Sequence, residues 1–435
     1  MSPRTTASTS LNLLRKRCDE VDFQLGKQVH VRSSPRPSAL LASAILCRSL
    51  KRSDRLFLFS VCPLLESVDT VNNLRDTYKN YSLIFLGVDL EGKKRIKKGP
   101  GYPLFIGGEF DSDKAARHSI GDNRTMLAAT YALADTKLDI VGYETALAAM
   151  GTLLGEDPDS TGIKANKELL DQAIDEKALE EKQGLRLVGA NRLGLTNLLL
   201  QSTRPFLQGV SGDQKACSDI LDDADIPTTK YNQPLRALTT KEIQRLNNVL
   251  ISKVPAIIPY LEPEYMAPHE KDTSPLQSTS DICALLETSW GLREFGTAFS
   301  VLLGDRGASL RGLLDSHTKH REETVSAIIG LQDSLEEETL PDRVTLRVSD
   351  RVLTDVGRIV FDLGLVDEKT PQIALSNDSN TEIVWRDDGI QIGEVLRRLK
   401  STSTEIVTTS LRSIRLPKLP DEDLVDVMKT VIGED

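Results

Sequence analysis

Short apolar runs alternate with helix-like segments through the first third of the chain. Three runs rich in β-forming residues predict strands at 55–61, 81–90 and 103–110, each followed by a polar turn. Alanine- and leucine-rich segments at 125–136 and 144–155 predict helices. Strands that alternate with helices at this spacing indicate βαβ units, and hence a parallel sheet covered by helices on both faces.

The segment from Val29 to Leu50 predicts a buried strand, a tight turn and an alanine-rich helix. The turn contains Ser34, Arg36 and Ser38 with prolines between them, and no carboxylate or histidine. An enzyme of this layout would carry metal-binding carboxylates in such a turn. The turn therefore argues against a metal centre at the end of the first strand.

The pattern changes in the second third of the chain. The acidic segment 156–184 predicts an exposed connecting helix with a solvated charged face. Residues 185–304 are mainly helical, and 269–281 has the composition of a flexible surface loop. Apolar residues at helical spacing over 309–338 predict one long linking helix. Strand-like runs return near the end, at 343–350, 371–378 and 381–388.

We therefore predict an α/β protein in four parts. These are an N-terminal parallel-sheet domain at 1–183, a mainly helical middle region at 184–308, the linking helix at 309–338 and a smaller α/β domain at 339–435. A chain of 435 residues is long enough for two or three domains.

Composition narrows the class of protein. A hydrophobic fraction of 39% with 27% charged residues is typical of a globular protein, and no apolar run approaches the roughly 20 residues that span a bilayer. We expect no secretory signal, no membrane association and a cytoplasmic location. The five cysteines have no C-x-x-C spacing, which predicts reduced, mostly buried thiols. The net charge of −10 disfavours a broad grip on phosphate backbones but allows a local basic groove.

Two segments have the form of longer motifs. Residues 184–226 begin with GLRLVG and continue with STRPFLQGVSG, and residues 290–306 read WGLREFGTAFSVLLGDR. In this order, together with the turn at Ser34 and the long helix, they resemble the RecJ-like branch of the DHH phosphoesterase superfamily. Members combine an N-terminal α/β domain that holds two metal ions, a linking helix and a C-terminal DHH-associated domain that binds the substrate. The resemblance covers most of the chain and implies this architecture.

The resemblance also implies where catalytic ligands would stand. The family's H-x-D-x-D-G turn falls at Ser34, Arg36, Ser38 and Ala39. Its D-H-H motif falls at Gly107, Gly108 and Glu109. A further aspartate position falls at Thr152, and the C-terminal G-G-G-H turn falls at 401–404, without glycine or histidine. The isolated strand-end aspartate is either retained as Asp89 or replaced by Gly87, depending on the register.

These replacements predict a catalytically inactive member with no metal and no other cofactor. Two-metal hydrolysis needs carboxylates and imidazoles around two cations about 4 Å apart, and an arginine in their place repels the cations. Inactive archaeal RecJ-like proteins resemble the RecJ-like subunit of the eukaryotic CMG replicative helicase, which joins GINS and the MCM ring. The resemblance implies a nucleoid-associated replisome subunit that bridges GINS and MCM and contacts single-stranded DNA. The candidate contacts are Arg186, Arg192 and Arg204.

Two alternatives remain open at this stage. The first is a metal-dependent, single-strand-specific 5′ exonuclease or phosphoesterase with a divergent site, whose ligands would come from Asp89, Glu109, Asp111, Asp113 and His118. The second is a scaffold with a different partner. Other candidate chemistry has simpler explanations: His317 and His320 read as surface histidines, His30 as a satisfied core residue, and 209–213 as a structural turn.

Overall fold

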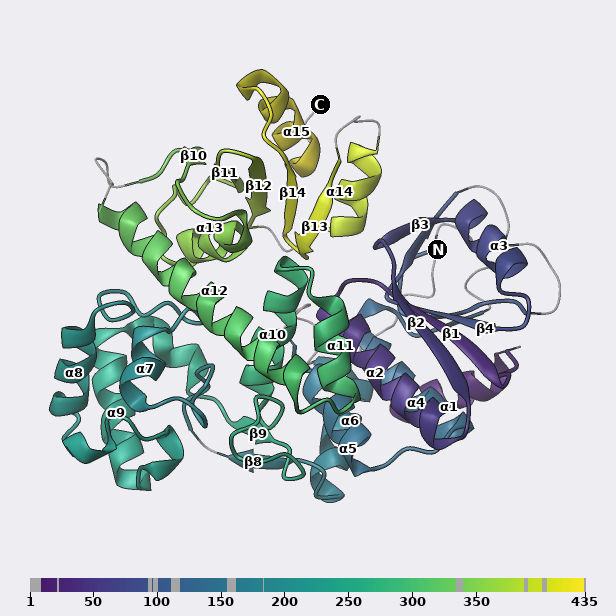
Figure 1. The fold of residues 1–435 in the computed structure, drawn as a ribbon, viewed down its shortest axis with the longest axis horizontal. Coiled ribbons are helices and arrows are strands. Elements are labelled where there is room, and N and C mark those ends of the chain that lie inside the picture. The colour runs from purple at the N-terminus through teal and green to yellow at the C-terminus, as the bar shows by residue number, and fades with distance from the viewer. Residues whose placement is uncertain are drawn as a thin grey trace. The chain divides into compact units, whose positions relative to one another are not determined.

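The computed structural model describes residues 9–21, 23–92, 96, 101–110, 118–154, 162–182, 184–333, 339–386, 390–400 and 405–433. The chain folds into two compact units, each built from three stretches of sequence (Figure 1). The first unit contains Met1–Glu181, Tyr265–Glu270 and Glu294–Arg311, and the second contains Lys182–Glu264, Lys271–Arg293 and Gly312–Asp435. The second unit thus combines most of the predicted middle region with the predicted C-terminal domain.

The first unit is built on a five-stranded sheet. Its strand order is β2 (Leu56–Val61), β1 (Gln28–Ser33), β4 (Ser82–Leu86), β6 (Leu104–Ile106) and β7 (Ser119–Ile120). Every neighbouring pair of strands is parallel, which confirms the predicted parallel sheet. Two short strands, β3 (Leu65–Ser67) and β5 (Asp89–Glu91), pair in parallel beside it.

Helices cover both faces of this sheet. They are α1 (Leu11–Glu20), α2 (Pro37–Arg52), α3 (Val68–Thr77), α4 (Met126–Lys137), α5 (Gly142–Gly151), α6 (Lys164–Asp175) and α11 (Phe295–Leu303). Leu83 and Phe85 of β4 share an apolar cluster with Val68 and Val71 of α3. Helix α2 contacts β1 and β4, and α4 contacts β6. Because successive strand residues point to opposite faces, burial on both sides explains the continuous apolar run of β4.

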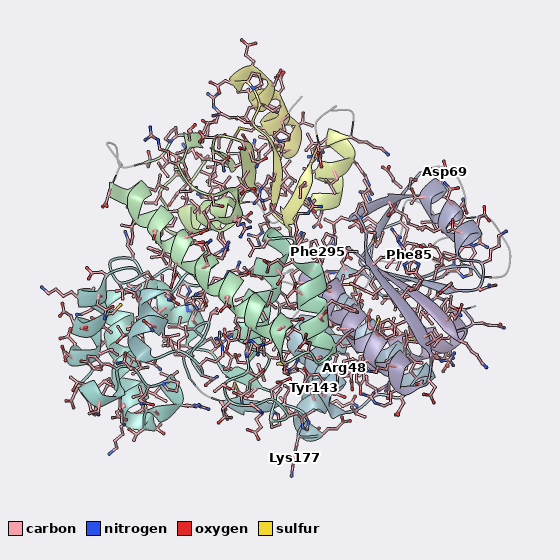
Figure 2. All side chains as sticks on the ribbon, viewed as in Figure 1. Arg48, Asp69, Phe85, Tyr143, Lys177 and Phe295 are labelled. Carbon is pink, nitrogen blue, oxygen red and sulfur yellow. The ribbon has the colours of Figure 1, made fainter. Side chains whose placement is uncertain are left out.

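A buried ion pair joins α2 to α5. Arg48 Nε lies 2.6 Å from Oε1 of Glu144, whose side chain is fully buried. The Arg48 guanidinium also lies over the Tyr143 ring, 4.6 Å from its centroid (Figure 2). Arg52 Nη2 contacts the same Glu144 oxygen at 2.9 Å. A buried carboxylate is stable only when its charge is paired, so these contacts tie the two helices together.

Two surface assignments from the sequence were wrong. Helix α6 is not an exposed connector, because Ala165, Leu169 and Ala173 form a buried stripe along it, and it packs against α1 and α5. The predicted flexible loop is buried from residue 274 to 279, and Ser278 caps the N-terminus of the next helix. Both segments are rich in polar residues, but a few apolar or capping residues determine which part of each segment is buried.

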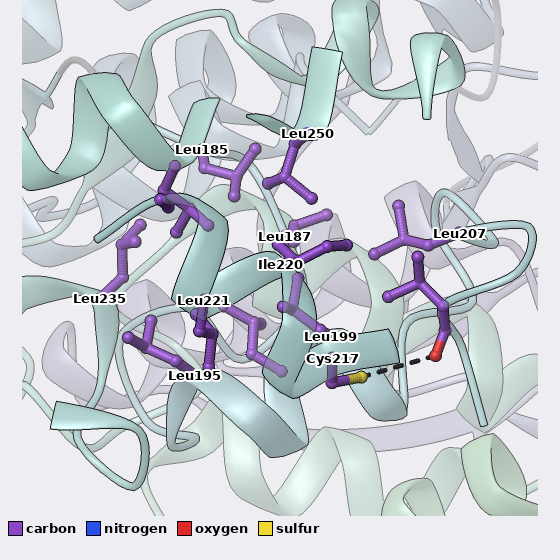
Figure 3. Packing of buried hydrophobic residues seen from close by; sticks show 14 of the residues in the cluster. Leu185, Leu187, Leu195, Leu199, Leu207, Cys217, Ile220, Leu221, Leu235 and Leu250 are labelled. Atoms are coloured by element: carbon purple, nitrogen blue, oxygen red, sulfur yellow. Dashed lines mark hydrogen bonds between the residues drawn. The ribbon is translucent and has the colours of Figure 1, made fainter. Parts of the chain in front are cut away.

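The helical part of the second unit has its own core. This helical part comprises α7 (Leu195–Leu200), α8 (Gln214–Asp223), α9 (Thr240–Lys253) and α10 (Thr279–Gly291). Figure 3 shows leucines from several of these elements converging on Cys217 and Ile220 of α8, with the Cys217 thiol 3.5 Å from the Val210 carbonyl oxygen. Short 3-10 helices lie in the connections, at Thr228–Lys230, Leu235–Ala237 and Pro255–Tyr260.

The predicted long helix is confirmed as α12 (Ala308–Asp333), while residues 334–338 lie outside the described part of the chain. A mixed sheet follows, in the order β10 (Arg343–Thr345), β11 (Gln372–Ser376), β12 (Asn380–Trp385), β14 (Ser413–Pro417) and β13 (Val407–Ser410). Its helices are α13 (Leu353–Asp362), α14 (Ile392–Leu399) and α15 (Asp421–Ile432). Ile328 of α12 shares a core with Val356 and Ile359 of α13, so the long helix packs against the C-terminal sheet domain.

The remaining short elements are β8 (Glu180–Lys182), β9 (Glu264–Met266), a 3-10 turn at Asn123–Thr125 and another, η7, at Asp350–Val352. All five cysteines are free thiols and four are buried, as predicted. Among the described residues, no helix has the length and apolar character that a membrane crossing requires.

Candidate functional site

The carboxyl ends of β1, β4 and β6 lie side by side at one edge of the first sheet. The amide groups of the residues that follow each strand continue the ladder: Ser34 N–H donates to Leu86 O and Gly87 N–H to Ile106 O, both at 2.9 Å. The chain passes from β1 to β2 on one side and then returns to β4 on the other, so the strand order reverses at β1. In open α/β sheets ligands bind outside the carboxyl ends of the strands at such a point. This edge is therefore the candidate site.

An arginine and an aspartate meet at this edge. Arg36 is the N-cap residue of α2, and its side chain is 8% exposed. Its Nη2 lies 3.8 Å from Oδ2 of Asp89, whose side chain is 2% exposed. The other carboxylate oxygen of Asp89 accepts the Glu109 N–H at 2.8 Å. The carboxylate is therefore balanced by a guanidinium and a backbone amide.

Two glycines at the end of β6 hold the backbone close to its neighbours. Gly107 and Gly108 have φ angles of +70° and +91°, which favour glycine. A Cβ at Gly108 would stand 2.2 Å from the Val88 carbonyl oxygen, and a Cβ at Gly107 would stand 3.1 Å from the sulfur of Met126. Side chains of the D-H-H type cannot be accommodated here without a backbone shift.

The residues at this edge do not fit two divalent metal ions. Magnesium and manganese require several oxygen ligands, and a second shell that orients them. The side chains gathered here are the Ser34 hydroxyl, the Arg36 guanidinium, the Asp89 carboxylate and the Met126 thioether. The Asp89 carboxylate faces the Arg36 guanidinium, whose positive charge repels a metal ion. Within the described residues, no group of three or more His, Cys, Asp or Glu side chains is arranged to hold a metal ion.

The other residues that the sequence assigned to degenerate ligand positions are spread over several elements. Ser38 lies in the first turn of α2 and is buried, as is Ala39. Thr152 follows the last residue of α5, and its hydroxyl donates to the Ala149 carbonyl oxygen at 2.7 Å. Residues 401–404, Asp111 and Asp113 lie outside the described part of the chain. His118 stacks on Tyr102, with ring centroids 3.7 Å apart.

The three candidate nucleic-acid arginines are all ion-paired within the second unit. Arg186 Nη1 lies 2.8 Å from Glu262, whose side chain is 66% exposed. Arg192 Nε lies 3.1 Å from the buried Asp281. Arg204 contacts Glu287 and lies 3.0 Å from Asp355. Their role in nucleic-acid binding stays a prediction.

The histidines of α12 are not surface residues, which corrects the sequence assignment. His317 and His320 are each 5% exposed, and His320 Nε2 lies 2.7 Å from the Asp355 carboxylate. Burial alone would raise the pKa of Asp355, but Arg204, the hydrogen bond from His320 and Arg358 hold that pKa well below its usual range. Asp355 therefore stays ionised and orients His320 through its Nε2–H. This network joins α12 to α13.

His30 is a core residue, as predicted. It is 3% exposed, and its Nε2 lies 2.9 Å from the Ser60 hydroxyl on the neighbouring strand. Burial, reinforced by Arg32, lowers the pKa of His30 to about 4. The imidazole is therefore neutral at physiological pH.

The comparison with solved structures identifies the architecture. CDC45 from Entamoeba histolytica matches over 97% of this chain and 97% of its own, with a TM-score of 0.58 and 12% sequence identity. This chain has the fold of CDC45. The likeness confirms the RecJ-like DHH fold that the sequence motifs predicted.

Two further solved structures are less similar to this chain. RecJ from Thermus thermophilus, in complex with Mn2+, matches over 99% of this chain and 56% of its own, with a TM-score of 0.47 and 13% identity. The DHH domain of a member of the S1p family of ribosomal proteins matches over 97% of this chain and 88% of its own, with a TM-score of 0.37 and 8% identity. No family model and no curated protein sequence matches this chain.

Two features of the CDC45-like chain escaped the sequence analysis. Met126 lies in an alanine-rich helix, where a methionine reads as an ordinary core residue, and nothing local indicates that it lies against Gly87 and Gly107. Asp355 lies in the first turn of α13, and its separation of 35 residues from His320 conceals the pair. Neither contact has a local sequence signal.

Proposed function

We propose that this protein is a non-catalytic, RecJ-like subunit of the replisome that bridges GINS and the MCM helicase in DNA replication. The observation that carries the proposal is the Arg36–Asp89 pair at the switch point of a CDC45-like fold. A guanidinium faces the carboxylate where catalysis would need cations, so the described residues offer no ligand set for two-metal hydrolysis at this edge. The protein then acts through its surfaces, at the place where DNA is copied.

An exposed sheet edge supports a protein partner. Strand β2 is the last strand on its side of the parallel sheet, so one row of its backbone groups has no partner strand within the described part of the chain. Leu56 is 69% exposed and Leu58 is 41% exposed on this strand. Folded proteins normally cover or charge such an edge, because another chain can add a strand to it. We assign this edge to a protein subunit of the assembly.

Contact with single-stranded DNA is a finer part of the proposal. Of the three candidate arginines, Arg186 is paired with an exposed carboxylate, whereas Arg192 is paired with a buried one. An exposed ion pair is worth little and exchanges easily with a phosphate contact. Arg186 is therefore the candidate that a nucleic-acid backbone would engage first.

A tagged pull-down from native lysate, followed by mass spectrometry, tests the proposal. We expect GINS and MCM subunits to be captured by the wild type. Capture should fall in the double variant Leu56→Glu, Leu58→Glu. The matched control is Ile258→Glu, which places the same charge at a residue that is 55% exposed in the second unit and should keep the capture.

A nuclease assay on the same preparation separates the alternative. A scaffold cleaves no 5′-ended single strands in manganese, whereas an exonuclease with a divergent site must do so. Capture of neither GINS nor MCM, together with manganese-dependent cleavage, would favour the enzyme. Capture of an unrelated assembly without cleavage would indicate a scaffold with another partner.

A further inference from the structure

Strand β10 forms one edge of the C-terminal sheet (Figure 1). Its inner side pairs with β11, and just beyond the strand Leu346 N–H donates to Ser376 O at 2.7 Å. Backbone groups of successive strand residues point to opposite edges, so those of Arg343 and Thr345 point away from β11. Within the described part of the chain, no strand pairs with this outer edge. Another chain can therefore add a strand to it.

The side chains of this segment alternate between an apolar set and an exposed set. The apolar set packs against the core that α12 and α13 share, at Val344, Leu346 and Val348. The exposed set contains Arg343, Thr345 and Arg347. Because the buried face fixes the register of the segment, its outer edge and the two arginines keep one orientation. The edge is thus a preformed strand that presents positive side chains.

The two arginines are only weakly balanced by acidic groups. Arg343 lies 3.6 Å from its neighbour Asp342, and the two side chains are 41% and 56% exposed. An ion pair at such exposure contributes little. Among the described residues Arg347 makes no ion pair, and Asp350, three residues further on, lies 3.6 Å from Arg415 instead. The edge therefore has positive charge that a binding partner can balance.

This charge selects among the chains that could pair with the edge. An antiparallel pairing of two copies centred on Thr345 would place Arg343 of each copy opposite Arg347 of the other. Like charges opposite each other in a sheet are destabilising, whereas opposite charges stabilise the pair. A nucleic acid would balance the arginines but has no row of amide and carbonyl groups to continue the ladder. An extended acidic segment of a protein does both.

We propose that the outer edge of β10 docks an extended acidic segment of a partner protein, which adds a strand to the C-terminal sheet. Main-chain hydrogen bonds to Arg343 and Thr345 hold the segment, and its acidic side chains face Arg343 and Arg347. This surface goes beyond the proposed function, which assigns the β2 edge to a subunit of the assembly. Strand β2 belongs to the first unit and β10 to the second, so the two surfaces are tested separately.

Peptide binding to the unaltered full chain is the first test. The probe is a short fluorescent peptide in which glutamate alternates with valine, followed by anisotropy. The matching peptide of lysine and valine should bind about tenfold more weakly or worse, because its charge has the wrong sign. Two further versions of the acidic peptide carry N-methyl groups, one on the glutamates and the other on the valines. Only the version whose methyl groups face β10 should lose affinity, because it cannot donate to the strand.

A backbone variant tests strand addition from the side of the protein. Thr345→Pro removes an outward N–H, and proline is tolerated on an edge strand where its N–H would face solvent. It should weaken binding of the acidic peptide by about three- to tenfold, as expected for one lost hydrogen bond. The matched control Thr345→Ala keeps the N–H and should bind like the wild type. If Thr345→Pro fails to fold, the methylated peptides on the wild type carry this test.

Charge reversal tests the role of the two arginines. The double variant Arg343→Glu, Arg347→Glu should bind the acidic peptide about tenfold more weakly or worse, and should bind the lysine peptide more tightly. The matched control is Lys215→Glu, Lys241→Glu, which makes the same change in net charge at two exposed lysines elsewhere in the second unit. This control should bind both peptides like the wild type.

The proposal is wrong if the wild type binds neither peptide, or binds both equally well. It is also wrong if Thr345→Pro and both methylated peptides bind like their parents, because charge alone would then explain the binding. Binding of a single-stranded oligonucleotide, lost in the double arginine variant and without binding of the acidic peptide, would assign the edge to nucleic acid instead. Loss of peptide binding leaves the capture of GINS and MCM unaffected, so each proposal can fail without the other.

Discussion

Building the family's metal-binding turn into this chain provides the sharpest test of the proposed non-catalytic function. The triple variant Ser34→His, Arg36→Asp, Ser38→Asp rebuilds the family's first motif next to Asp89. It adds one imidazole and two carboxylates, which together with Asp89 make three carboxylates at the carboxyl edge of the sheet. We expect no nuclease activity, because two of the three D-H-H positions remain glycines, and a Cβ at one of them, Gly108, would stand 2.2 Å from the Val88 carbonyl oxygen.

The structure also predicts a loss of stability. Arg36 and Asp89 are 3.8 Å apart, and at an effective dielectric constant of about 20 their attraction is about 4 kcal/mol. The variant removes this attraction and places a second carboxylate beside a buried one. Removing one partner of a buried pair typically costs about 3–5 kcal/mol. Because domains have a net stability of about 5–15 kcal/mol, the first unit should unfold at a clearly lower denaturant concentration.

Urea unfolding with and without manganese, and cleavage of a 5′-labelled single strand, measure both expectations. The single variant Arg36→Gln shows how much of the destabilisation comes from the lost pair, because it removes the guanidinium without adding a carboxylate. A cation that bound the rebuilt turn would restore stability, because a ligand that binds only the folded state stabilises it. Manganese-dependent cleavage, or full recovery of the wild-type midpoint in manganese, would show that our account of the site is wrong.

Three further changes test other parts of the structure. In urea unfolding, Gly108→Ala should destabilise the fold by more than about 3 kcal/mol, because its Cβ would stand 2.2 Å from a carbonyl oxygen. The control Gly101→Ala should cost only about 1–2 kcal/mol, because Gly101 also has a positive φ, +76°, but no atom lies within 4 Å of its Cβ position. The pKa of His30 is about 4 in the folded chain and 6.5 in the unfolded chain, so the unfolded chain takes up a proton at higher pH than the folded chain does. The free energy of unfolding of the wild type should therefore fall as the pH drops from 6.5 to 4, by at most about 3 kcal/mol. In His30→Gln this pH dependence should be weaker. Asp355→Asn should cost about 3–5 kcal/mol in thermal unfolding, because the buried Asp355 is the counter-charge of the part-buried Arg204 and Arg358. Asp362→Asn, at a site that is 55% exposed, should cost under about 1 kcal/mol; equal effects would contradict the network.

Local patterns predicted most elements, and errors arose where a single residue changes the local structure. The apolar run 81–90 reads as one strand, but β4 ends at Leu86 and β5 begins at Asp89. Gly87, with a φ of +63°, separates them. The periodicity of apolar residues shows that a strand is present, but it does not show where the backbone leaves the sheet, because a glycine is compatible with either conformation.

Burial of polar residues was harder to predict than the helices that carry them. The long helix was correctly expected, yet His317 and His320 were assigned to its surface and are buried. His320 is hydrogen-bonded to Asp355 of α13, and burial together with the charges of Arg321 and Arg192 holds the pKa of His317 well below its usual range, so His317 is buried in its neutral form. The burial of α6 was also missed, because three apolar residues pack one face of this helix into the core although most of its residues are polar or charged.

The amino-acid sequence by itself determined the α/β class, the parallel sheet and the long helix, and it placed Ser34, Arg36 and Ser38, none of them a carboxylate, in the turn after the first strand. These features can be predicted from the type and spacing of residues within short segments of the sequence. Only the tertiary structure decided that Arg36 meets Asp89, that Met126 lies against the glycines and that Ser34 keeps a hydroxyl unpaired among the described residues. Such contacts depend on strand register and helix packing between distant segments, and no local pattern encodes them.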